Sequence, residues 1–206
     1  MHIDLTEMLR CPEPHDEAFL VMSTGEMRGR MVRSGLLGCP VCGREYPLVK
    51  GVARFSGSGE QRAVPSAAPT GPPRSALPVD PESLQALLDL SGPGGYVVLV
   101  GNAARHAVGL AGLMGGIHFV GIDAPPDVEE LPVLSLLACD SMIPLRRAMA
   151  RAVVVGRDHA EAAWLAEAQR ILLPGRRLVV EREDVTPPAG LTRVVSGQGL
   201  LVAERR

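Results

Sequence analysis

The sequence predicts an α/β protein: a doubly wound, mostly parallel sheet with a C-terminal antiparallel hairpin, preceded by a small zinc-ribbon domain. One observation is a series of short β-branched runs after residue 80, separated by helix-length segments. The other is a set of metal-binding side chains near the N-terminus. Because a Pro-, Gly- and Ser-rich stretch separates these regions, we expect a zinc ribbon over 1–55, a linker over 56–79 and the α/β domain over 80–206.

The N-terminal region carries two pairs of metal-binding side chains, Cys11 with His15 and Cys39 with Cys42. A Cys-x-x-Cys-Gly turn lets both thiolates point to one side, and an imidazole nitrogen can complete a tetrahedral zinc site. For His15 the alternative is an exposed loop residue. For Cys39 and Cys42 it is a disulfide, but no secretory signal precedes them and Cys139 lies far away in sequence. The pattern predicts a structural Zn²⁺ site in a reducing cytoplasm.

Two segments of this region also carry a resemblance. Leu9-Arg-Cys-Pro12 and Cys39-Pro-Val-Cys-Gly-Arg-Glu-Tyr-Pro47 resemble the small zinc-ribbon proteins that partner and activate methyltransferases of tRNA, rRNA and release factors. The resemblance covers roughly the first quarter of the chain, and it departs from the family at His15. It implies a recognition or stabilising module with a protein partner, and not a catalytic centre.

Composition limits the partners. The 206 residues are 46% hydrophobic, and no apolar run is long enough to cross a bilayer, so we expect a cytoplasmic protein without a membrane span. A net charge of -2 provides no general basic field for nucleic acid. The arginines of the ribbon could still form a local RNA-binding patch, although a solvated face is favoured: Arg28, Arg30, Arg33 and Arg44.

The linker and the helix after it have opposite compositions. Residues 56–79 combine Pro, Gly, Ala, Ser and Thr without a periodic apolar pattern, which is typical of a tether. Asp80-Pro81-Glu82 then reads as an N-cap, a first-turn proline and an acidic first turn. The leucines that follow predict a helix that ends at Gly92.

The remaining elements alternate as a parallel sheet requires. A helix is expected from about Ala104 to Met114, and Asp158 with Glu161 is expected to cap a second helix that ends at Pro174-Gly175. Two segments around Gly197-Gln-Gly199 predict the terminal hairpin. The expected parallel strands are Tyr96–Val100, His118–Ile122, Val133–Ala138, Ala152–Val155 and Arg177–Val180.

This order of elements resembles the class I S-adenosylmethionine-dependent methyltransferases, with their Rossmann-like sheet, from Asp80 to the end of the chain. The segment from Trp164 to Val180 looks like the region that leads into the family's fifth strand. Cys139-Asp140-Ser-Met-Ile-Pro-Leu looks like the loop after its third strand. The resemblance implies S-adenosylmethionine as cofactor.

The glycine motif of that cofactor site is degenerate here. Gly101, Asn102 and Ala103 occupy the first strand-to-helix turn, but the acid expected in the first strand is absent and Arg105 stands where a glycine is usual. The resemblance assigns Asp123 to the ribose hydroxyls and Asp140 to the adenine amine. For each aspartate the alternative is a strand-end turn or a helix cap.

Two functions remain open. One is an S-adenosylmethionine-dependent methyltransferase of unknown acceptor, with the ribbon as an accessory domain in cis. The other is a catalytically inactive methyltransferase-like scaffold or regulatory partner that binds another protein. No catalytic residue is assigned: His106 and His159 could act as general bases if they face the cleft, but a structural or surface role is favoured for each.

Overall fold

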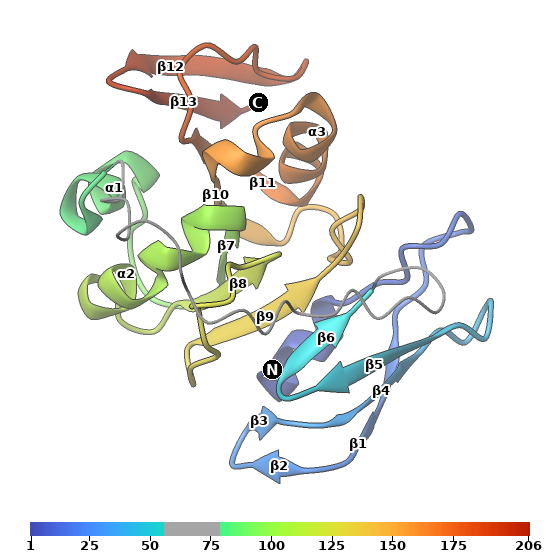
Figure 1. Ribbon diagram of the computed structural model, residues 1–206. Coiled ribbons are helices and arrows are strands. Elements are labelled where there is room, and N and C mark those ends of the chain that lie inside the picture. The colour runs from blue at the N-terminus through green and yellow to red at the C-terminus, as the bar shows by residue number, and fades with distance from the viewer. Residues whose placement is uncertain (56–78) are drawn as a thin grey trace.

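The computed structural model describes residues 1–55 and 79–206 (Figure 1). The predicted linker, 56–79, therefore lies outside the described residues except for its last one. Val79 is buried in one cluster with Leu84 of helix α1 (Pro81–Leu88). Val79 thus packs in the core of the C-terminal region.

The N-terminal region consists of a short 3-10 helix followed by small strands. Strands β1, β4, β5 and β6 form an antiparallel array, and β2 pairs with β3 as a separate hairpin. The elements are η1 (Ile3–Met8), β1 (Val21–Thr24), β2 (Met27–Arg28), β3 (Met31–Val32), β4 (Gly35–Gly38), β5 (Glu45–Val49) and β6 (Val52–Arg54).

The C-terminal region has the predicted fold class. Its central strands β9, β8, β7, β10 and β11 are parallel, and the antiparallel pair β13–β12 closes the sheet. The elements are α1, β7 (Tyr96–Val100), η2 (Gly101–His106), α2 (Ala107–Leu113), β8 (His118–Ile122), β9 (Leu134–Ala138), β10 (Ala150–Val155), η3 (Arg157–His159), α3 (Ala162–Ile171), β11 (Leu172–Val180), β12 (Leu191–Gly197) and β13 (Leu200–Arg205).

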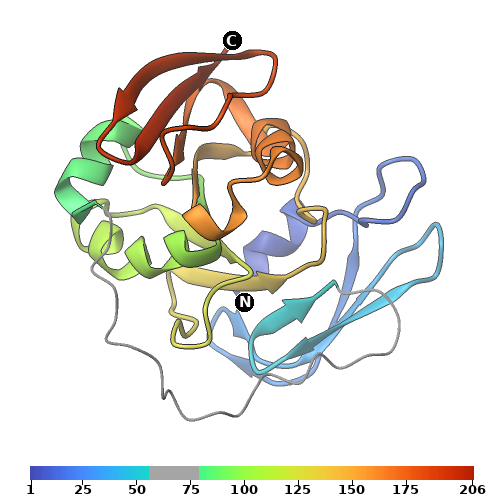
Figure 2. The same ribbon diagram turned by 45° about the horizontal axis from the view of Figure 1, so that its top comes forward.

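One sheet runs through both regions. Its order is β1-β4-β5-β6-β9-β8-β7-β10-β11-β13-β12, and the junction is a parallel pairing between β6 and β9. Ala53 lies opposite Leu137, and beyond β6 the Phe55 amide donates to the Ala138 carbonyl at 2.7 Å. Figure 2 shows the N-terminal strands and the C-terminal hairpin at opposite ends of the molecule. The N-terminal region therefore docks on the C-terminal region of the same chain. The sequence alone did not distinguish this arrangement from docking on a partner.

Each face of the sheet has its own core. On one face, α1 and α2 contribute Leu84, Leu88 and Leu110 to a cluster with sheet residues such as Leu99. On the other face, η1 and α3 bury apolar side chains together with Leu137 of β9 and Leu48 of β5. The helices α1 and α2 lie on the opposite side of the sheet from α3 (Figure 1). No helix in residues 1–55 and 79–206 is both long and apolar enough to cross a bilayer.

Two helix boundaries differ from the sequence prediction. The N-cap of α1 is confirmed, because Asp80 Oδ1 accepts from the Ser83 amide at 2.8 Å. The helix ends at Leu88, before Gly92, and its C-cap residue Asp89 adopts a left-handed conformation. The second helix starts at Gly101 and not at Ala104, as the 3-10 turn η2 that runs directly into α2.

The predicted caps of α3 are wrong. Glu161 is the N-cap residue but makes no side-chain cap, and Asp158 makes a contact elsewhere, described below. Pro174 and Gly175 do not end the helix, because α3 stops at Ile171. They lie inside β11, where the pairing with β10 shifts register between Leu172 and Arg177. A proline without an N–H and a glycine at φ 69° suit such a bulge.

The connections around β9 also depart from a fully wound α/β sheet. Within the described residues no helix joins β8 to β9 or β9 to β10. On one face of the sheet, the N-terminal segment from η1 to Cys11 lies where such a helix would pack. Within it, Leu9 forms a β-bridge with Leu145, and both side chains are fully buried. The Arg10 amide donates to Pro144 O at 3.0 Å, and the Arg146 amide donates to Met8 O at 2.9 Å.

A polar cluster fixes the first residues of the chain against β8 and β9. The His2 amide donates to Ser135 Oγ at 2.8 Å, and His118 Nε2 lies 2.9 Å from the same oxygen. The Met1 amino group donates to two main-chain carbonyls and lies 2.9 Å from the Glu130 carboxylate, which also pairs with Arg33. The Met1 amino group, the His2 amide and Ser135 Oγ thus have hydrogen-bond partners at the junction.

The polar cluster predicts a pH dependence of stability. Burial, with His2 and the Met1 amino group nearby, lowers the pKa of His118 to about 4. The unfolded chain, with a histidine pKa of about 6.5, takes up this proton first, so stability is full above about pH 6.5 and falls toward about pH 4. Allowing for partial exposure, wild type should lose about 1–2 kcal/mol more than His118→Gln between about pH 7.5 and pH 5 in urea unfolding. Equal losses would refute this assignment.

Candidate functional site

The four predicted metal ligands lie together. Cys11 follows the bridge that ties the N-terminal segment to the C-terminal region, His15 lies in the next loop, and Cys39 and Cys42 occupy the turn between β4 and β5. One ligand atom from each residue lies within 4.8 Å of the others. Cys39 Sγ is 3.4 Å from His15 Nε2, and Cys11 Sγ is 3.8 Å from Cys42 Sγ. These residues could hold a metal ion.

The backbone around the cluster holds the ligands in place. The Gly43 amide donates to Cys39 O at 3.0 Å, and the Cys39 amide donates to Arg44 O at 2.9 Å, which closes the turn that presents both cysteines. His15 Nδ1 lies 2.6 Å from Asp16 O. A proton on Nδ1 leaves the Nε2 lone pair directed at the other ligands, as second-shell carbonyls do in metal sites.

The donor set fits a soft or borderline cation. Three thiols and one imidazole form the ligand set of a closed, four-coordinate zinc site. Burial raises the pKa of the Cys11 thiol to about 11, although the Tyr46 hydroxyl, 3.2 Å from Cys11 Sγ, lowers it. A bound cation would hold such a thiol as thiolate. Tyr46 was missed in the sequence, where it read only as part of the Cys-rich segment.

The cofactor edge lies at the carboxyl ends of the parallel strands. The chain reverses its direction of travel across the sheet between β7 and β10, which is where open α/β sheets bind ligands. Gly101, Asn102 and Ala103 follow β7 at this point and form the first turn of η2. Gly101 has φ 62°, a conformation that suits glycine.

The carboxylate of Asp158 fills this turn. The Asn102 amide donates to Asp158 Oδ1 at 3.0 Å and lies 3.2 Å from Oδ2. A side chain added at Gly101 would place its Cβ 2.6 Å from Asp158 Oδ2 and 2.3 Å from His159 Nδ1. The approach from β10 is equally close, since a Cβ at Gly156 would lie 3.0 Å from the amides of Asn102 and Ala103. The chain's own atoms close the switch point here.

The His159 side chain packs against the same turn after β7, at Gly101. Its ring stands edge-on to Trp164 at a centroid distance of 4.8 Å, with Nδ1 3.1 Å from Asp158 Oδ2 and Nε2 3.9 Å from Asp123 Oδ2. Asp158 raises the pKa of His159. Burial alone would raise the pKa of Asp158, but His159 and the Asn102 amide outweigh it and lower that pKa. A charged pair is therefore favoured across the turn.

The two aspartates assigned to the cofactor have different surroundings. Asp123, at φ 47° after β8, accepts from the Cys139 amide through Oδ1 at 2.8 Å, so it links the ends of β8 and β9. Asp140 follows β9 and is exposed. Arg105 points to the loop after β8, where its Nη2 lies 2.8 Å from Asp127 Oδ1. The structure thus places Asp123 next to His159, which packs at the turn of Gly101. Asp140 lies farther along the sheet, after β9.

A buried histidine–glutamate pair between the end of η2 and the end of β11 was not predicted from the sequence. His106 is fully buried, and its Nε2 lies 2.6 Å from Glu181 Oε1 at the end of β11. Its Nδ1 has no hydrogen-bond partner. His106 is therefore enclosed in the core and not presented to a cleft. A glutamate directly after a buried strand was the available signal.

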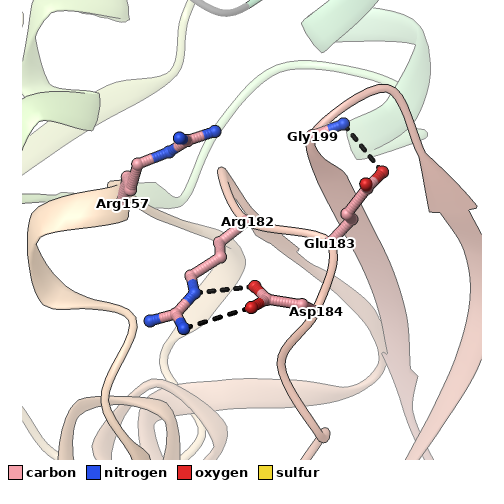
Figure 3. Close-up of a pocket in the computed structure, with 5 residues that line it drawn as sticks. All are labelled: Arg157, Arg182, Glu183, Asp184 and Gly199. Carbon is pink, nitrogen blue, oxygen red and sulfur yellow. Dashed lines mark hydrogen bonds and ion pairs between the residues drawn. The ribbon is translucent and has the colours of Figure 1, made fainter.

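A cavity of about 510 Å³ lies beside the switch point, between η3, the end of β11 and the β12–β13 turn (Figure 3). One ion pair and two contacts with backbone groups form its wall. Arg182 Nε donates to Asp184 Oδ1 at 2.7 Å, and the Gly199 amide donates to Glu183 Oε2 at 2.9 Å. Arg157 Nε donates to a main-chain carbonyl at 3.4 Å. With two arginines and two carboxylates, the cavity offers a ligand no net charge.

No protein-family model and no curated protein sequence matches this chain. Among solved structures, it is similar to an S-adenosylmethionine-dependent methyltransferase from Aquifex aeolicus, with 20% identity, 61% of this chain and 88% of that chain covered, and a TM-score of 0.44. For the geranyl diphosphate C-methyltransferase from Streptomyces coelicolor A3(2), the identity is 12%, the coverage 61% and 75%, and the TM-score 0.47.

A further similar structure is the complex between the Haloferax volcanii Trm112 methyltransferase activator and a protein described as a methyltransferase. The identity is 23%, with 48% of this chain and 50% of that chain covered and a TM-score of 0.39. The chain thus spans half the length of that chain, and it spans 42% of a second geranyl diphosphate methyltransferase structure. At these identities and TM-scores the similarity assigns no activity or partner to the chain.

The metal cluster predicts a specific effect of His15→Ala. Loss of the imidazole leaves three thiols, so zinc affinity measured by competition with a chromophoric chelator should fall by about 100-fold or more. His159→Ala is the matched control, because His159 lies outside the cluster, and it should leave the affinity unchanged. Equal chelator resistance in wild type and His15→Ala would remove His15 from the site.

Proposed function

We propose that the chain is a non-catalytic methyltransferase-like scaffold that binds another protein and that a structural zinc ion stabilises. The observation that carries this is the position of Asp158, whose carboxylate accepts from the Asn102 amide inside the turn that would receive the cofactor. An active site of this kind needs that backbone free to approach the ligand. Here an internal side chain satisfies it.

Steric and electrostatic features support the same function. The closeness of Gly101 and Gly156 to the amides and side chains across the turn leaves little room for a cofactor between β7 and β10. Arg105 stands where the methyltransferase resemblance places a glycine, and an unpaired cation there would oppose a sulfonium cofactor. Because Arg105 pairs with Asp127, the charge of Arg105 is compensated, and the stronger obstacle is Asp158 with His159.

The N-terminal region suits a protein partner better than RNA. Every arginine of the predicted patch has a carboxylate partner: Arg28 with Glu26, Arg30 with Asp4, Arg33 with Glu130 and Arg44 with Glu13. Apolar side chains are exposed on the same region, with Phe19, Val21 and Val41 at 52%, 65% and 62% exposure. The zinc ribbon is thus the part of the molecule that we assign to partner binding, as a module over residues 1–55.

An S-adenosylmethionine-dependent methyltransferase with the ribbon as an accessory in cis is the second candidate. Asp123 and Asp140 favour it, because they follow β8 and β9 at the carboxyl edge of the sheet, where ribose and adenine groups would be held. This function requires Asp158 to leave the Asn102 amide. With the cofactor bound, the sulfonium would supply an activated methyl group, and the chain's residues would only align the acceptor.

Calorimetry with S-adenosylmethionine distinguishes the two functions. We expect no binding heat from folded, zinc-loaded wild type at about millimolar ligand, the weakest range in which binding would matter. The Asp158→Ala variant tests why wild type would not bind the cofactor, because the substitution frees the Asn102 amide. If this variant binds S-adenosylmethionine and wild type does not, Asp158 is the obstacle. Binding by wild type at about micromolar dissociation constants would overturn the scaffold proposal.

A further inference from the structure

The candidate metal site is open on one side. A cavity of about 520 Å³ adjoins it. Cys42 is exposed, whereas Cys11 and Cys39 are 2% and 3% exposed. The sulfur of Cys42 is therefore the ligand that a small solute can reach directly. The lining residues are Glu13, Pro14, His15, Cys42, Gly43 and Arg44.

The surroundings of Cys42 favour reaction of its sulfur. Glu13 and Arg44 line the same cavity as an ion pair and leave the sulfur of Cys42 open to a small solute. Cys11 Sγ lies 3.8 Å from Cys42 Sγ, close enough to act as the second thiol. Cys39 Sγ also lies within 4.8 Å of Cys42 Sγ, and it is 3.4 Å from His15 Nε2. An accessible thiol beside a resolving thiol is typical of an oxidation-sensitive pair.

We propose that Cys42 and Cys11 form a peroxide-sensitive pair, whose oxidation to a disulfide releases the metal ion. In the first step the Cys42 thiolate attacks hydrogen peroxide, the O–O bond breaks, and a sulfenic acid and hydroxide form. In the second, the Cys11 thiolate attacks the Cys42 sulfur, the S–O bond breaks and the S–S bond forms. Two protons from the buffer convert both hydroxides to water, and the peroxide takes up the two electrons that the thiolates lose.

Which two cysteines form the disulfide determines which segments stay cross-linked after the metal is lost. A Cys11–Cys42 disulfide joins the N-terminal segment to the turn between β4 and β5, which are the two segments that the metal would join. A Cys39–Cys42 disulfide would stay within one turn and release Cys11. A Cys11–Cys42 disulfide would therefore replace the metal as the cross-link between the segment at Cys11 and the turn between β4 and β5.

The test is oxidation of the zinc-loaded full chain with hydrogen peroxide. Zinc release is followed with a chromophoric chelator, and the products by intact mass and peptide mapping. We expect release of about one equivalent of zinc, a mass loss of about 2 Da and a Cys11–Cys42 cross-link, all reversed by a thiol reductant with added zinc. The oxidised protein should also unfold at a higher temperature than reduced protein stripped by chelator.

Two variants separate the pair from general thiol oxidation. Cys42→Ser should form no disulfide. Cys139→Ser is the matched control, because Cys139 is buried at the end of β9, outside the cluster, and this variant should behave as wild type. A Cys39–Cys42 disulfide, oxidation only to sulfinic or sulfonic acid, or resistance of wild type at the same peroxide concentration would each overturn the proposal.

The proposal rests on zinc binding at the proposed site but not on the absence of catalysis. Zinc content is measured before peroxide is added, so a chain that binds no zinc refutes the metal site itself. Zinc that is bound and then retained under peroxide refutes only the oxidation. Calorimetry with S-adenosylmethionine reports on the scaffold function separately.

Discussion

The parallel pairing of β6 with β9 is the interaction on which the rest of the structure depends. Without it, β6 and β9 would both be edge strands with unpaired amides and carbonyls. Ala53 and Leu137 are opposite each other at this junction, and both are buried in the core of one face. The N-terminal region is therefore not a separate body on a tether but one end of the sheet.

This junction explains two other features. On one face of β9, η1 and the segment after it take the place of a helix through contacts such as the bridge between Leu9 and Leu145. Cys11 follows this segment directly, so the metal cluster lies next to the loop after β9. Stability of the metal site and of that part of the sheet are thus expected to be coupled.

At the carboxyl edge of β7, β8 and β10, the chain's own side chains occupy the positions that a ligand would fill. Asp158 accepts from the Asn102 amide, His159 balances its charge, and Asp123 is engaged by the Cys139 amide. A ligand would have to displace at least the first of these contacts. The same atoms that make this edge stable therefore make it a poor binding site, which is why a scaffold is the function favoured here.

Local patterns in the sequence predicted much of this structure. The grouping of Cys39 and Cys42 in a possible metal cluster was predictable because both lie in one turn, and the start of α1 was predictable because Asp80 caps the first turn of the helix. The contact of Asp158 with the Asn102 amide was not predictable. In the sequence, a carboxylate three residues before Glu161 looks like a helix cap, and only the structure shows that the ends of β7 and β10 meet there. The β6–β9 pairing was equally out of reach, because the choice of neighbour for a short apolar strand depends on contacts far apart in sequence.

Hydrogen exchange of the zinc-loaded chain, measured before and after removal of the metal by a chelator, tests the central claim most directly. If the two regions form one sheet through β6 and β9, amides of β5, β6 and β9 should lose protection together when zinc is removed, while β10 and β13 keep theirs. Loss of protection confined to β4, β5 and β6, with β9 unchanged, would contradict the account and show that the N-terminal region unfolds as an independent body.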